Sequence, residues 1–204
     1  MVSRQLKEQT VRRGLLCSFA AFSWLFVISI TTALGDLNLS PQKEEFELEG
    51  VKMWHLTFDT GLNQKATYQP PSGWLYSGST NQLTLQPPGK NQTQVAITKT
   101  PLKAPASLDG KTRKKLAEEA LASVPKGSEQ QKIESEEANP LRISGKDTYL
   151  VQLTYTFYGE KFSRYCLFLN SKSYQLRFQL TCRESDYKEL SKAFQKSLYT
   201  WQHI

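Results

Sequence analysis

The feature that most constrains the fold is a run of alternating apolar and polar residues at 149–182. Apolar side chains at every second position are typical of half-buried antiparallel strands. Two short breaks, Gly159-Glu160 and residues 170–173, divide the run into three segments. The run therefore predicts a meander of three antiparallel strands.

Each strand of this meander is expected to have one apolar face, which another element must cover. The apolar positions are Tyr149, Val151, Leu153, Tyr155 and Phe157 in the first strand and Tyr174, Leu176, Phe178 and Leu180 in the third. The polar positions of the third strand are Gln175, Arg177, Gln179 and Thr181. Residues 186–201 can supply the cover, because Tyr187, Leu190, Phe194, Leu198 and Trp201 recur at helical spacing and Asp186 suits an N-cap.

The rest of the chain predicts further strands and one more helix. Alternation or β-branched residues predict strands near 51–58, 66–69, 81–85, 94–98 and 130–136, with 51–58 as the first strand. Acidic residues also alternate with Phe46 and Leu48 over 44–49. A helix is expected over 111–124, ended by Pro125 and Gly127. This order predicts an α+β fold with helices packed on an antiparallel sheet.

The N-terminus looks like a targeting segment. Four basic residues precede an uncharged apolar run, and Ala33-Leu34-Gly35 resembles a cleavage site. A cleaved signal peptide over 1–35 and an uncleaved anchor over 15–35 both remain open, since 21 residues can cross a bilayer. Both place the domain outside the cytoplasm. We expect a linker at 36–43 and one α+β domain over 44–204.

Charge and cysteine usage exclude some classes of protein. The formal charge is +7, and it falls to +4 without residues 1–35, leaving 22 basic against 18 acidic residues. That balance does not favour nucleic-acid binding, which usually needs a concentrated basic stripe. Cys166 and Cys182 are expected to be unpaired, because the predicted hairpin places Cys182 opposite about residue 161 and too far from Cys166 for a disulfide.

The sequence offers no constellation for catalysis or for a bound metal or cofactor. The two histidines, His55 and His203, have no nearby ligand motif. The single conceivable Cys/His pair, Cys166 with His55, has bulky neighbours and nothing that would activate a thiolate. Two triplets, at Asn38 and Asn91, fit sugar attachment only in a eukaryotic secretory route. We therefore expect a protein that is not an enzyme.

Three candidate binding regions follow from the sequence. One is the polar face of the third meander strand, which is expected to be open to solvent. Lys111, Arg113, Lys114 and Lys115 crowd the first turns of the helix at 111–124. They form either a solvated face or a surface for anionic lipid or an acidic partner. Trp74, Tyr155 and Trp201 are candidates to line a ligand cavity between sheet and helices.

Several segments together resemble the PsbP-like family, named for an extrinsic subunit of photosystem II. The resemblance rests on Tyr-Gln-Pro-Pro-Ser-Gly-Trp at 68–74, the strand at 95–98 before Pro101, the helix at 111–124 and the segment 159–201. It covers about 66–201, so the segment 44–58 lies outside it and is interpreted as an added strand. It implies an α/β/α sandwich, exported or lumenal, that acts in binding or assembly. No functional residue carries over.

Two hypotheses for function remain at this point. The first is an exported or membrane-tethered module, without catalytic activity, that contacts an unidentified protein at a membrane. The second is a carrier that holds a small ligand in a cavity between sheet and helices.

Overall fold

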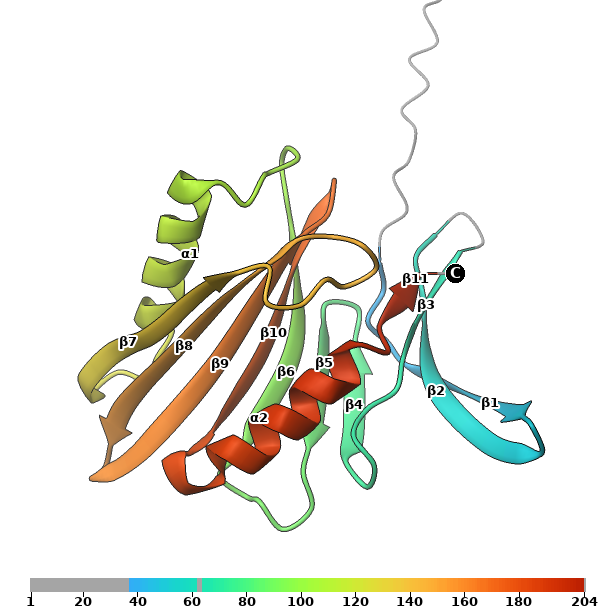
Figure 1. Ribbon diagram of the computed structural model, residues 1–204, viewed down its shortest axis with the longest axis horizontal. Coiled ribbons are helices and arrows are strands. Elements are labelled where there is room, and N and C mark those ends of the chain that lie inside the picture. The colour runs from blue at the N-terminus through green and yellow to red at the C-terminus, as the bar shows by residue number, and fades with distance from the viewer. Residues whose placement is uncertain (1–36, 62–63, 204) are drawn as a thin grey trace, which may run out of the picture. The chain divides into compact units, whose positions relative to one another are not determined.

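Two antiparallel sheets carry the fold in residues 37–61 and 64–203, which are the residues that the computed structural model describes (Figure 1). The larger sheet has seven strands in the order β4-β5-β6-β10-β9-β8-β7, and the smaller has four in the order β1-β2-β3-β11. This is an antiparallel α+β fold, as the sequence predicts. The expected targeting segment at 1–35 lies outside the described residues.

The first three strands and the last one form the smaller sheet, and the seven strands between them form the larger sheet. The smaller sheet contains β1 (Gln42–Leu48), β2 (Val51–Asp59), β3 (Lys65–Tyr68) and β11 (Gln202–His203). The larger contains β4 (Leu75–Ser79), β5 (Gln82–Gln86), β6 (Gln94–Pro101), β7 (Glu129–Ala138), β8 (Thr148–Phe157), β9 (Glu160–Asn170) and β10 (Tyr174–Arg183). The helices are α1 (Gly110–Ala122) and α2 (Glu184–Leu198).

The meander of β8, β9 and β10 forms as predicted, but its two apolar faces are not on the same side. Phe178 of β10 is opposite Leu167, which is in turn opposite Leu150. The predicted apolar residues of β8, such as Tyr149 and Val151, therefore lie on the other side of the sheet. Both sides are apolar here, so the expectation that one helix covers one apolar face is wrong.

Each side of the larger sheet has its own helix. Leu190, Phe194 and Leu198 of α2 pack in a large core cluster with Leu167 and Phe178. A second cluster on the other side joins Leu116, Ala117 and Ala120 of α1 to Tyr149, Val151, Leu153, Tyr155, Cys166 and Phe168. The two helices and the sheet thus make three layers, with α2 lying across the strands in Figure 1.

The second helix begins earlier than its capping signal predicts. It follows β10 directly, and Arg183 at the N-cap makes no side-chain capping hydrogen bond within the described part of the chain. Glu184 and Asp186 both fall in the first turn, where carboxylates favour the positive end of the helix dipole. The prediction of Asp186 as N-cap is therefore wrong. Trp201 lies beyond the helix.

Trp201 joins the smaller sheet to the larger one. Its ring stacks on Phe58 of β2 at a centroid distance of 5.4 Å and meets Phe178 of β10 edge-on at 5.5 Å. Tyr68 of β3 lies 5.7 Å away. The two sheets consequently share one apolar core.

The segment expected as a linker at 36–43 is part of the fold from residue 37 onward. Leu37 and Leu39 are fully buried in the main core. Backbone hydrogen bonds hold this segment in place: Asn38 N donates to Asp59 O at 2.7 Å, and Leu39 N donates to Thr80 O at 3.0 Å. The segment has only two apolar residues among polar ones, which is too few for hydrophobic periodicity to predict that it is buried.

The prediction of unpaired cysteines is confirmed. Cys166 and Cys182 are both free and buried. Cys182 is opposite Ser163, three residues from Cys166, and the two thiols belong to the clusters on opposite sides of the sheet. A disulfide between them is therefore geometrically excluded.

Among the residues that the structure describes, no helix has the length and apolar character needed to cross a bilayer.

Candidate functional site

The three residues predicted to line a ligand cavity do not meet. Trp74 and Trp201 are buried in the main core, whereas Tyr155 is buried on the opposite side of the larger sheet. There the ring of Tyr155 stacks on Phe162 at 5.5 Å and lies 5.5 Å from the Arg164 guanidinium. All three are core residues, and they line no common pocket in the described structure.

The polar face of β10 is largely covered and is not an open surface. Thr181 is buried, while Gln175, Arg177 and Gln179 are half-buried. Arg164, itself buried, donates from Nε to Thr181 Oγ1 at 2.9 Å and from Nη1 to Ser123 Oγ, just after α1, at 2.8 Å. These contacts hold the end of α1 against the sheet.

The predicted basic surface lies at the N-terminal end of α1, with carboxylates close by. Lys111, Lys114 and Lys115 are exposed and Arg113 is half-buried. Asp109 caps the helix by accepting from Thr112 N at 2.8 Å, and Lys115 Nζ lies 3.5 Å from Glu119. A cavity of about 440 Å³ places Arg113 and Lys114 beside Glu136 and Glu137 of β7. Lipid contact at these four cations stays a prediction.

Three exposed apolar side chains lie together near the tip of the β1–β2 hairpin. The register pairs Leu48 with Val51 and Phe46 with Met53, so these four side chains share one face of the smaller sheet. Leu48 is 57% exposed, Val51 60% and Phe46 37%. The opposite face carries Trp54, Leu56 and Phe58, which pack toward the core. We call the face with Phe46, Leu48, Val51 and Met53 the outer hairpin face.

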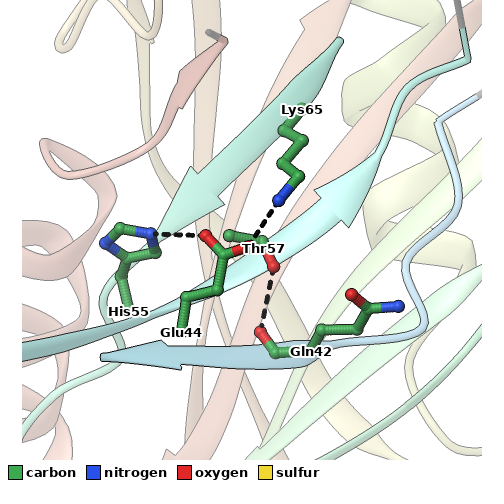
Figure 2. A network of polar contacts seen from close by, with 5 residues as sticks. All are labelled: Gln42, Glu44, His55, Thr57 and Lys65. Atoms are coloured by element: carbon green, nitrogen blue, oxygen red, sulfur yellow. Dashed lines mark hydrogen bonds and ion pairs between the residues drawn. The ribbon is translucent and has the colours of Figure 1, made fainter. Parts of the chain in front are cut away.

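An ion cluster continues the outer hairpin face away from the tip (Figure 2). Glu44 on β1 accepts a hydrogen bond from the Lys65 ammonium of β3, and its other oxygen lies 3.6 Å from His55 Nε2 on β2. Lys65 beside it lowers the pKa of the Glu44 carboxyl. The hydroxyl of Thr57 donates to the Gln42 carbonyl at 3.3 Å.

This cluster ties the three strands together and orients the apolar tip. Glu44 contacts both β2 and β3, and the His55 ring lies 4.9 Å from the Phe46 ring. A Glu49-Gly50 turn closes the hairpin, with both residues at positive φ, as a two-residue hairpin turn of this kind requires. The sequence predicts the first strand at 51–58, so β1 is an additional strand, although Phe46 and Leu48 do alternate with glutamates. The sequence also does not show that the apolar side stays uncovered.

Comparison with solved structures shows which fold the chain has. The solution structure of a cyanobacterial PsbP (CyanoP) from Synechocystis sp. PCC 6803 covers 81% of this chain and 94% of its own, with a TM-score of 0.52 and 12% identity. The chain has a PsbP-like fold. The resemblance drawn from residues 68–74 and the segments after them is confirmed at the level of the fold.

Two other solved structures align with this chain at lower TM-scores. LpqN, involved in cell envelope biogenesis of Mycobacterium tuberculosis, covers 80% of this chain and 91% of its own at a TM-score of 0.49 and 11% identity. The protein of unknown function PA94 from Pseudomonas aeruginosa covers 78% and 95% at a TM-score of 0.41 and 13% identity. No protein-family model and no curated protein sequence matches the chain.

Proposed function

We propose that this chain is a binding module without catalytic activity, exported or tethered to a membrane, that docks a partner protein through the outer hairpin face. The observation that carries the proposal is the exposure of Phe46, Leu48 and Val51 side by side on one face of the smaller sheet. Exposed apolar patches rimmed by polar residues mark protein contact surfaces. Here Glu44, His55 and Lys65 supply the polar rim.

The charge of the hairpin indicates what kind of partner fits it. Residues 42–52 contain four glutamates and two lysines, a net charge of −2 in a chain whose formal charge is +7. A partner with an apolar cleft bordered by basic side chains matches this surface, because opposite potentials steer and align an encounter.

A second copy of this chain fits the same surface poorly. Strand β1 is the edge of the smaller sheet, and pairing two such edges would bring Glu44, Glu45 and Glu47 of both copies together. Charged side chains on an edge strand are a known protection against edge-to-edge association. The proposal therefore commits to a different protein as the partner.

The chemistry of the described residues supports a role in binding. Burial raises the pKa of the Cys166 thiol to about 11 and that of Cys182 to about 12, so neither is a thiolate nucleophile near neutral pH. His55 lies in the smaller sheet, apart from both thiols. Within residues 37–61 and 64–203, no three His, Cys, Asp or Glu side chains are grouped to hold a metal ion.

The proposed location outside the cytoplasm rests on the sequence of residues 1–35. The fold that the structure describes begins just after that segment, with Leu37 and Leu39 buried in the main core.

Site-specific photocrosslinking of the full-length chain in its own cells tests the proposal. A photoreactive amino acid replaces Leu48 in one variant and Leu75, an exposed leucine of β4 in the larger sheet, in the matched control. We expect a discrete adduct with a second protein from position 48 and none from position 75. Adding Phe46→Ser and Val51→Ser should abolish the adduct. Equal labelling from both positions, no adduct, or an adduct of two copies of this chain would contradict the proposal.

A further inference from the structure

A cavity lies away from the outer hairpin face, where the β9–β10 turn meets β11. It has a volume of about 780 Å³. Its walls come from segments that are far apart in sequence: Thr60 after β2, Lys146 before β8, Lys172 in the turn, and His203 in β11. The fold therefore assembles this cavity, and no continuous motif in the sequence encodes it.

The charge of the lining has one sign. The basic side chains that line the cavity are Lys146, Lys172 and His203, with no carboxylate among the described lining residues. Four smaller cavities in the described structure all include a carboxylate, from Glu118, Asp59, Asp109 or Asp186 among others. This cavity is therefore distinct in presenting basic groups that are not balanced within it.

The basic groups are close enough to act on one another. Lys146 is half-buried, and its Nζ donates to Ser171 Oγ at 3.1 Å. Burial and the neighbouring charge of Lys172 lower the pKa of Lys146. Burial and the charge of Lys146 likewise lower the pKa of His203. An anion in the cavity would relieve both effects, since opposite charge favours the protonated forms.

The turn that forms one wall is held in place before any ligand binds. Ser171 N donates to Tyr174 O at 2.8 Å, and Leu102 N donates to Ser173 O at 2.8 Å. The amide of Asn170 donates to Ala106 O at 3.1 Å and accepts from Gln175 at 2.8 Å. Because the wall is already ordered, a ligand would lose little affinity in ordering it. The hydroxyls of Ser171 and Ser173 add donors beside the lysines.

We propose that this cavity binds a phosphate group, carried either by a small soluble molecule or by a lipid headgroup. Lysine ammonium groups and hydroxyl donors are the ligands that hold phosphate oxygens in proteins. A volume of about 780 Å³ is in the range of pockets that hold a whole small molecule, whereas a nucleic acid needs an extended basic stripe. This inference is independent of the partner surface, because it uses other residues on other elements.

Binding of defined probes to the full-length chain tests it. Titration calorimetry uses inorganic phosphate, glycerol phosphate, and vesicles of phosphatidic acid in phosphatidylcholine, while nuclear magnetic resonance follows the His203 ring. We expect saturable binding of at least one probe together with a shift of the His203 signals. Binding of the soluble probes indicates a small phosphorylated ligand, and binding of the vesicles alone indicates a headgroup.

Substitutions separate this cavity from the general positive charge of the chain. Lys146→Met and Lys172→Met should each weaken binding about tenfold or more, because each removes a charge-assisted contact. Lys188→Met removes the same charge from an exposed position on α2 and should change affinity by less than about twofold. Lys172 is exposed, so its variant should fold even if that of Lys146 is unstable. Absence of saturable binding to every probe, or equal weakening by Lys188→Met, would overturn the proposal.

Discussion

Cys166 and Cys182 show how burial decides the chemistry of a single residue. Both are fully buried, and the thiols face the two separate core clusters. Desolvation disfavours the thiolate and is the main cause of the raised pKa of each. Arg164 and Arg177 lower the pKa of Cys166 in part but do not cancel this effect. The two thiols act as small apolar core groups.

The raised pKa of Cys166 predicts a loss of stability at alkaline pH. The thiol stays protonated in the folded chain up to about pH 11, whereas in the unfolded chain it titrates near its ordinary 9.0. Its contribution is therefore fully present below pH 9 and is lost as pH rises from about 9 to 11, by about 1.4 kcal/mol per unit. Urea denaturation should show the stability gap between wild type and Cys166→Ala narrowing by this amount. A gap that is constant from pH 8 to 11 would contradict the prediction.

At the scale of elements, two helices stabilise the larger sheet from opposite sides. Phe194 of α2 is fully buried and meets Tyr165 edge-on at 6.1 Å. Leu116 of α1 is buried in the separate cluster beneath that helix. Because both sides of β8 and β9 are apolar, loss of either helix would expose core side chains.

Paired truncations test the role of each helix. Phe194→Ala and Leu116→Ala should each lower the free energy of unfolding by about 3 kcal/mol, since each leaves a cavity in a packed cluster. The two effects should add, because the residues lie on opposite sides of the sheet. Lys188→Ala on the exposed side of α2 serves as control and should stay within about 0.5 kcal/mol. Chemical denaturation that finds Leu116→Ala as stable as the control would show that α1 does not cover the sheet.

Periodicity predicts most of these elements but not how they are paired. The alternation at 149–182 and the helical spacing at 111–124 and 186–201 give nearly all of β8, β9, β10, α1 and α2. Alternation does not say which side of each strand faces which helix. Tyr149 is therefore expected to pack under the C-terminal helix, whereas it packs with α1. Strand β4 is missed because Ser-Gly-Ser at 77–79 has weak strand propensity.

Candidate sites are harder to predict than elements because they depend on contacts between distant segments. Lys146, Lys172 and His203 lie in two turns and a two-residue strand, none of which has a periodic signal. Trp74 and Trp201 stand out in the sequence as large aromatic residues. Such residues are as typical of a protein core as of a ligand site, and here both are buried in the core.

At the scale of the whole folded unit, the two sheets share one core, whereas the tip of the β1–β2 hairpin is not covered by other described residues. Trp201, Phe58 and Tyr68 join the two sheets, so the base of β2 belongs to the main core. Burial falls along β2 toward the turn, from buried Phe58 to exposed Val51. Apolar side chains that do not stabilise the core are available to stabilise a complex.

Replacing the apolar tip gives the most direct test that this surface serves binding and not folding. The measurement compares wild type with the triple variant Phe46→Ser, Leu48→Ser, Val51→Ser for free energy of unfolding and for migration on native gels of extracts from its own cells. We predict a stability within about 0.5 kcal/mol of wild type, with the wild-type chain in a larger complex and the variant migrating alone. A variant that unfolds, or that migrates in the same complex as wild type, would contradict the account.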